Sequence, residues 1–192
     1  MEHSIKILSR KLLSDNWATL HKVEYVHTLP SGKSQNEVRE VYDRGNGAAI
    51  LLYNIAKGTV ILTRQLRIAT WYNGNTEGLM IEACAGLLDE ADPEDCIRRE
   101  TEEETGYTLT EVTKVMEAYM SPGSVSEILY FFIAAYSDAM KTGEGGGLDS
   151  EQENIEVLEI SFNEALAMIK TKQIKDAKTI MLLQYLRLEG IL

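Results

Sequence analysis

Cysteine, histidine and basic residues are scarce in this chain of 192 residues. It has two cysteines, Cys84 and Cys96, and three histidines. A structural zinc site needs four such ligands at recognisable spacings, so we expect both cysteines to be reduced, small apolar side chains. The 30 acidic residues outnumber the 19 lysines and arginines, which gives a formal net charge of −11. This charge argues against a nucleic acid partner.

Long hydrophobic runs are also missing. The longest unbroken apolar run, Ile128–Tyr136, has nine residues, whereas a membrane-spanning helix needs roughly twenty. The first residues, MEHSIKILSRKLL, mix charged with apolar side chains, unlike a signal peptide. We therefore expect a soluble cytoplasmic protein with no membrane partner. The apolar content of 44% supports a sizeable core, and the length fits one domain with or without a small appendage.

The most informative segment is RETEEETGY, residues 99–107. Glu100 and Glu104 lie one helical turn apart, and Glu103 lies between them on nearly the same side. Such carboxylates repel one another unless a cation sits among them, and Mg²⁺ binds carboxylate oxygens together with substrate phosphates. Pro93 suits a first helical turn and Gly106 suits a C-cap, so we expect a helix between them. Alone, an acidic run more often marks a solvated helix face.

The remaining sequence alternates expected strands and helices. Their order fits an α/β fold in which a mixed sheet lies between helices as an α/β/α sandwich. The acidic, glycine-rich segment 143–153 is either a plain surface loop or a lid that brings a carboxylate to the metal. The expected strands are Ser4–Leu13, Trp17–His27, Asn36–Tyr42, Ala48–Ile55, Thr59–Thr70, Met80–Cys84, Glu111–Met120, Glu127–Tyr136 and Ile155–Ile160, and the further helices are Phe162–Thr171 and Lys178–Leu188.

The acidic helix and its flanks resemble the Nudix box of the Nudix hydrolases, which cleave nucleoside diphosphates linked to another group. The shared pattern is a glycine, Gly86, then an acid, then Arg-Glu-x-x-Glu-Glu-x-Gly-apolar. Two features depart from it. The acid is Asp92, six residues after Gly86 rather than seven, and only six residues separate it from Arg99. Thr101 also fills a position that is normally apolar. We expect Arg99 to pair with neighbouring carboxylates rather than to touch substrate.

Segments outside the box resemble the GDP-mannose pyrophosphatases of this family, most closely in residues 64–75 and 119–127. The resemblance implies Mg²⁺-dependent hydrolysis of a nucleotide sugar, GDP-mannose giving GMP and mannose 1-phosphate. ADP-ribose hydrolysis is the alternative, and a non-catalytic binding domain is a weaker one because all three helix carboxylates are present. It also implies an N-terminal antiparallel β subdomain, residues 1–43, that forms a homodimer, followed by a Nudix domain, residues 44–192.

The same resemblance supplies a metal site. Glu100, Glu104 and the backbone carbonyl of Ala85 match metal ligands of the family. A carboxylate of the late loop completes the set: counting back from the following strand selects Glu153, which we favour, and counting forward from the glycines selects Glu151. Glu153 is also the candidate general base, with Glu103 as the alternative.

Substrate contacts are likewise implied by the resemblance. Arg39 and Glu40 are expected to reach across a dimer interface, and Val38 stands where the resembling enzymes have Lys. Trp17 can stack on a ring, arginines can grip phosphate, and a lysine can neutralise it. The expected contact residues are Trp17, Arg39, Glu40, Arg67, Ala85, Gly86, Leu87, Glu104, Glu127 and Lys178.

Overall fold

The chain forms two compact units in a computed structural model that describes residues 3–88, 92–148, 150 and 152–192. The first unit contains Met1–Asn46 and Tyr119–Ile128. The second contains Gly47–Ala118 and Leu129–Leu192. A connection between two strands of the second unit therefore packs with the N-terminal segment.

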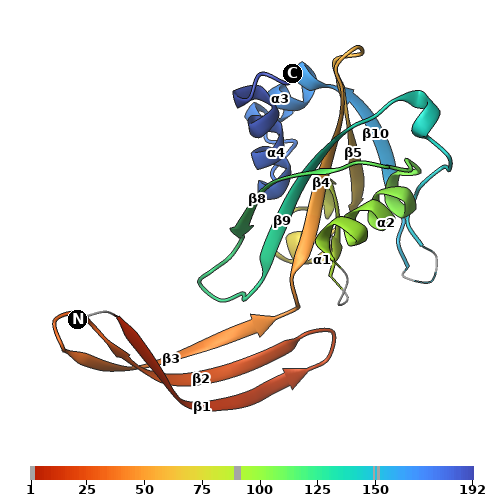
Figure 1. Ribbon diagram of the computed structural model, residues 1–192. Coiled ribbons are helices and arrows are strands. Elements are labelled where there is room, and N and C mark those ends of the chain that lie inside the picture. The colour runs from red at the N-terminus through yellow and green to blue at the C-terminus, as the bar shows by residue number, and fades with distance from the viewer. Residues whose placement is uncertain (1–2, 89–91, 149, 151) are drawn as a thin grey trace. The chain divides into compact units, whose positions relative to one another are not determined.

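The first unit is a three-stranded antiparallel sheet in the order β1-β2-β3, drawn in red to orange in Figure 1. The three strands confirm the sequence-based expectation. In the turn between the second and the third strand, Gly32 has a φ of 82°. The segment Tyr119–Ile128 of the same unit hydrogen-bonds to β3, because the Tyr42 N–H donates to the Ser124 carbonyl over 2.8 Å. The strands are β1 (Ser4–Asp15), β2 (Thr19–Thr28) and β3 (Ser34–Asp43).

The second unit contains a mixed sheet. Its main path has the order β10-β5-β4-β9-β8, and β6 and β7 pair with β5 and β4. Strands β4 and β9 are parallel, whereas β5 is antiparallel to β4, β6 and β10. The strands are β4 (Gly47–Asn54), β5 (Thr59–Leu66), β6 (Leu79–Glu82), β7 (Cys84–Leu87), β8 (Thr113–Tyr119), β9 (Ile128–Ala135) and β10 (Glu156–Ser161).

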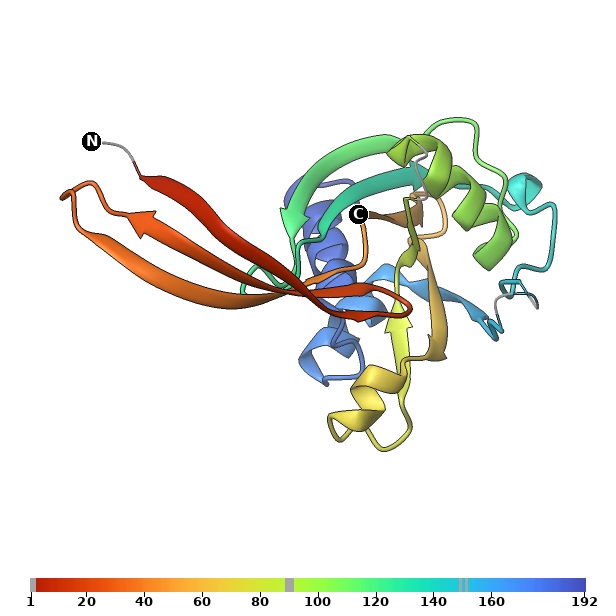
Figure 2. The ribbon, with the colours of Figure 1, turned by 90° about the horizontal axis from the view of Figure 1, so that it is seen from below.

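Helices cover both faces of this sheet. They are α1 (Ile68–Tyr72), α2 (Pro93–Thr105), α3 (Phe162–Lys170) and α4 (Ala177–Leu188), with a short 3₁₀ turn at Asp138–Met140. Successive residues of a strand point to opposite faces, and β4 is buried on both. Ile50 belongs to a cluster with Ile97 of α2, while Leu51 is buried on the other face. Helix α2 lies on one side of β4 and β9, and α3 and α4 lie on the other (Figure 1, Figure 2). This arrangement confirms the expected α/β/α sandwich.

Helix α2 begins and ends where the sequence predicts. The Asp92 side chain accepts a hydrogen bond from the Glu94 N–H over 2.9 Å, which caps the first turn, and Pro93 occupies the first position. Gly106 ends the helix with a φ of 77°. Within the described part of the chain, no helix is long and apolar enough to cross a membrane.

The expectation of a strand continuing to Thr70 is wrong, because α1 begins at Ile68. Ile68 and Thr70 are β-branched and favour strands. Local hydrogen bonds override that preference: the Thr70 N–H donates to the Arg67 carbonyl over 2.8 Å, and the Thr70 hydroxyl donates to the same oxygen.

The expected strand Met80–Cys84 is also corrected, since it is two strands with different partners. The break falls at Ala83. Its N–H donates to the hydroxyl of Thr179 in α4 over 2.7 Å instead of to a neighbouring strand. The break at Ala83 lets β6 pair with β5 and β7 pair with β4, so the chain passes from β5 to β4 just before Gly86.

Candidate active site

Glu104 is the most buried carboxylate of the described residues. Its side chain is 2% exposed, and its Oε2 atom has no hydrogen-bond partner among them. Burial raises the pKa of Glu104 to about 7, the charges of Glu153 and Glu100 add to the shift, and the Cys84 thiol and Arg67 oppose it. An ionised carboxylate is unfavourable here without a cation, because removal from water penalises the charged form.

Glu100 lies one turn earlier on the same face of α2. Its Oε1 accepts a hydrogen bond from Arg99 over 3.0 Å, and its side chain is mostly buried. Burial raises the pKa of Glu100, and the Arg99 guanidinium opposes this. Gly86 makes room for Glu100, since a Cβ atom at Gly86 would lie 2.2 Å from the Glu100 carboxyl carbon. Strand β7 and the acidic helix therefore meet closely only because residue 86 lacks a side chain.

The glycine-rich loop after the 3₁₀ turn packs onto the C-terminal end of α2. The last carbonyls of a helix have no partner within the helix, and loop N–H groups supply it. Gly146 donates to the Glu104 carbonyl over 2.9 Å, and Gly147 donates to the Glu103 carbonyl over 3.1 Å. A Cβ atom at Gly106 would lie 2.1 Å from the Gly143 carbonyl oxygen, so the approach requires glycine. The segment is thus bound to the helix that carries the acidic face.

This loop brings Glu153 towards the acidic helix. Glu153 Oε2 accepts a hydrogen bond from the Leu148 N–H over 3.1 Å, and its charge raises the pKa values of Glu100 and Glu104. Glu151, the alternative late-loop carboxylate, lies outside the described residues. Glu103 is 4.0 Å from the Nε of Arg99. Arg99 thus pairs with both Glu100 and Glu103, as expected from the sequence.

A second charged cluster adjoins this one. Arg67, at the N-terminus of α1, and Lys178, in the first turn of α4, both donate to the buried carboxylate of Glu82 in β6. The charges of Arg67 and Glu104 interact, which places this cluster beside the acidic helix. The expected phosphate-binding residues Arg67 and Lys178 are therefore brought together. Leu87, at the end of β7, is held to α2 because the Cys96 thiol donates to its carbonyl over 3.2 Å.

Four of the expected substrate contacts belong to the first unit. Trp17 is 70% exposed, with the Arg44 guanidinium 5.4 Å from its ring centre. Arg44 also pairs with Glu127 over 3.3 Å, so one arginine connects two of the predicted residues.

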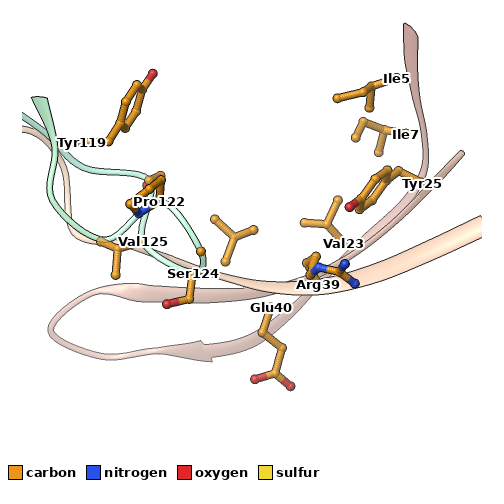
Figure 3. A pocket seen from close by; sticks show the side chains of 13 residues that line it. Ile5, Ile7, Val23, Tyr25, Arg39, Glu40, Tyr119, Pro122, Ser124 and Val125 are labelled. Atoms are coloured by element: carbon orange, nitrogen blue, oxygen red, sulfur yellow. The ribbon is translucent and has the colours of Figure 1, made fainter. Parts of the chain in front are cut away.

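Arg39 and Glu40 line a groove of 580 Å³ within the first unit. Being neighbours in β3, they point to opposite faces, and Figure 3 shows Glu40 directed away from the apolar side chains around Arg39. Arg39 donates to Glu37 over 3.0 Å. Val38 is about half exposed. The other lining residues are mostly apolar and include Ile5, Ile7, Val23, Tyr25, Tyr119, Pro122 and Val125.

Sequence reasoning missed three residues of these clusters: Glu82, Arg44 and Cys84. Glu82 left a readable signal, because it is a lone charge within the apolar run LMIEACA. Such a charge is buried only when it is paired. Arg44 and Cys84 left none, since their partners are distant in the sequence or lie on another element.

Comparison with known proteins agrees with this geometry. Residues 43–183 match the NUDIX domain, and residues 4–42 match the GDP-mannose pyrophosphatase NudK N-terminal domain. The chain belongs to the Nudix family. It is 54% identical over 192 residues, the full length of both chains, to proteins named GDP-mannose pyrophosphatase from Escherichia coli O157:H7 and from Shigella dysenteriae serotype 1 strain Sd197. A protein of that name from E. coli strain SMS-3-5 is 56% identical over 187 residues, 97% of each chain.

Nudix hydrolases generally use divalent metal ions, and the residues present fit such an ion. The unpartnered buried oxygen of Glu104 and the carboxylate of Glu100 are oxygen donors of the kind that hard cations prefer. Within the described ranges, no group of three acidic, histidine or cysteine side chains is arranged to hold a metal ion. Mg²⁺ typically uses one or two carboxylates and completes its shell with water and substrate phosphates. Two carboxylates are therefore enough for a divalent ion that is also bound by substrate.

Proposed function

We propose that this Nudix hydrolase cleaves GDP-mannose to GMP and mannose 1-phosphate with Mg²⁺. The observation that carries the proposal is the full-length identity of 54% to proteins named for this activity, which includes the N-terminal segment as well as the Nudix domain. The acidic helix and the Arg67–Glu82–Lys178 cluster supply the metal-binding and phosphate-binding chemistry that the reaction needs.

Glu100, Glu104, the Ala85 carbonyl and Glu153 would hold the metal. A bound divalent cation supplies charge neutralisation for the diphosphate and a lowered pKa for water. Glu104 is suited to this role because its ionised form needs a cation at neutral pH. Glu153 would accept the proton of the attacking water. The pairing of Glu103 with Arg99 supports Glu153 over Glu103 as the base.

The charged cluster beside the acidic helix would bind the rest of the substrate. Arg67 would grip a phosphate oxygen, and Gly86 and Leu87 would border the diphosphate through their backbone. Trp17 offers an exposed ring for stacking on the nucleoside or the sugar, with Arg44 beside it. Arg39, Glu40 and Glu127 complete the set of proposed contacts, together with Lys178.

A homodimer built by the N-terminal subdomain, residues 1–43, is also part of the proposal. Strand β1 is an edge strand that exposes apolar side chains, including Ile5, Ile7 and Leu12. Long apolar edges are rarely left uncovered in water. We expect light scattering coupled to gel filtration to give about twice the chain mass of 21.5 kDa. A monomer at micromolar concentration would contradict this.

Two nucleotide substrates compared side by side test the proposed activity. GDP-mannose and ADP-ribose are each incubated with the enzyme and Mg²⁺, and the products are resolved by chromatography. We expect GDP-mannose to be cleaved faster, with GMP and mannose 1-phosphate released in equal amounts. Preferred cleavage of ADP-ribose would leave diphosphate hydrolysis in place but contradict GDP-mannose as the substrate. Cleavage of neither nucleotide would contradict the proposed enzymatic activity altogether.

A further inference from the structure

Glu82 is a buried carboxylate whose oxygens accept hydrogen bonds from two cations, Arg67 and Lys178. Its side chain is 4% exposed. Oε2 accepts from Arg67 Nη2 over 2.8 Å and from Lys178 Nζ over 2.9 Å, and both oxygens accept from Arg67 Nε over 3.1–3.2 Å. Charge-assisted bonds in this fork geometry fix a guanidinium in orientation as well as in position.

Lys178 and Arg67 differ in how buried they are and in how many of their donor groups already have a partner. The Lys178 side chain is 13% exposed, and its ammonium group also lies 3.1 Å from Asp176, the N-cap of α4. Arg67 is 40% exposed. Its Nη1 atom makes no hydrogen bond within the described residues, whereas Nε and Nη2 are both bound to Glu82. Arg67 therefore keeps one donor edge available, whereas the Lys178 ammonium group is already shared between Glu82 and Asp176.

The backbone around Glu82 is fixed independently of the side-chain contacts. The next residue, Ala83, donates to the Thr179 hydroxyl, and the Arg67 N–H donates to the Gly78 carbonyl over 2.8 Å. Hydrogen bonds of the backbone therefore fix the chain at or next to both Glu82 and Arg67. An arginine that is already oriented loses less rotational freedom when it binds an anion.

We propose that Glu82 is a positioning residue, which holds the Nε edge of Arg67 so that the Nη1 edge faces a phosphate oxygen of the substrate. The inference rests on the proposed function for the identity of the anion. Glu82 does not touch the substrate and acts through Arg67, the less buried of its two partners. Its removal should weaken substrate binding as much as the loss of Arg67 does, and it should have little effect once Arg67 is gone.

A double-mutant cycle tests this inference. Glu82→Gln, Arg67→Met and the double variant are compared by the calorimetric Kd for GDP-mannose in EDTA, where no hydrolysis occurs, and by kcat and KM with Mg²⁺. We expect each single variant to raise Kd and KM by about ten-fold or more, and the double variant to add less than about two-fold to Arg67→Met. Glu82→Asp, which keeps the buried charge, should recover part of the affinity.

Glu156→Gln is the matched control, because it removes another arginine–glutamate pair of the same sheet, that with Arg64. We expect it to leave Kd and KM unchanged. If Glu82→Gln does not fold, as judged by circular dichroism, the cycle is run with Glu82→Asp. Additive effects in the cycle, or a normal Kd in folded Glu82→Gln, would overturn the inference alone. Wild-type protein that neither binds nor cleaves GDP-mannose would overturn the proposed function and the inference with it.

Discussion

Replacing Glu104 with Gln is expected to lower kcat for GDP-mannose by about a thousand-fold, the several kcal/mol that a catalytic metal supplies. Gln has nearly the same shape but cannot offer an anionic oxygen to a cation. The buried position of Glu104, its unpartnered oxygen and its interaction with Glu100 and Glu153 make it the centre of the proposed metal site. Initial rates of GMP release at saturating Mg²⁺ measure the effect.

Glu102→Gln is the control for this prediction, since Glu102 lies on the exposed face of the same helix. It changes the net charge equally and should leave kcat within about two-fold, as surface substitutions usually do. Near-normal turnover by Glu104→Gln, with unchanged circular dichroism, would contradict the proposed role of Glu104.

Glu104→Gln should also remove a pH dependence from the free energy of unfolding of the metal-free protein. The pKa of Glu104 is about 7 in the folded state against an ordinary value of 4.5. Its protonated form therefore stabilises the fold fully below pH 4.5, and this contribution, about 3 kcal/mol, is lost as the pH rises through 7. Urea unfolding in EDTA between pH 5 and pH 8 should show this loss in the wild type and a flatter profile in Glu104→Gln. The same dependence of unfolding free energy on pH in both proteins would contradict this prediction.

Replacing Gly106 with Ala is expected to reduce the free energy of unfolding by about 3 kcal/mol and to lower turnover as well. The added methyl group would lie 2.1 Å from the Gly143 carbonyl oxygen, and a φ of 77° disfavours any side chain. The backbone must move to relieve the contact. Because the loop that contains Gly143 also carries Glu153, we expect kcat to fall together with stability.

Gly58→Ala separates the clash from the backbone strain. Gly58 has a similar φ of 65°, but a Cβ atom there would meet nothing within 4 Å. Only the strain of about 1–2 kcal/mol remains, and turnover should be unchanged. Urea unfolding and initial rates compare the two variants. Equal destabilisation by both substitutions would show that close packing between α2 and the loop is unimportant.

Much of the fold could be predicted because local signals agree with the tertiary structure. Pro93 and Gly106 bound α2 through their backbone preferences alone. The hairpin of β4 and β5 follows from two apolar segments around a glycine turn. The prediction failed at Ile68–Tyr72 and at Ala83, where hydrogen bonds to Arg67 and to Thr179 decide the structure.

The candidate site was predictable where its residues share one helix face, and less so elsewhere. Glu100 and Glu104 follow from helical spacing and the family pattern. The Arg67–Glu82–Lys178 cluster joins three elements that are far apart in the sequence. The lone charge in an apolar run could mark Glu82 as a paired residue, but no local pattern could name its partners. Glu153 could be proposed only by counting residues. The packing of the glycine-rich loop onto the carbonyls of α2 gives its position a physical reason.

Metal dependence of GDP-mannose cleavage is the most direct test of the central claim. The purified enzyme is assayed for release of GMP and mannose 1-phosphate with Mg²⁺, after addition of excess EDTA, and after Mg²⁺ is restored. We predict rapid release, complete loss in EDTA and full recovery, with Glu104→Gln about a thousand-fold slower than the wild type whenever Mg²⁺ is present. Turnover that persists in EDTA, or that Glu104→Gln retains, would show that the acidic face of α2 does not carry the reaction.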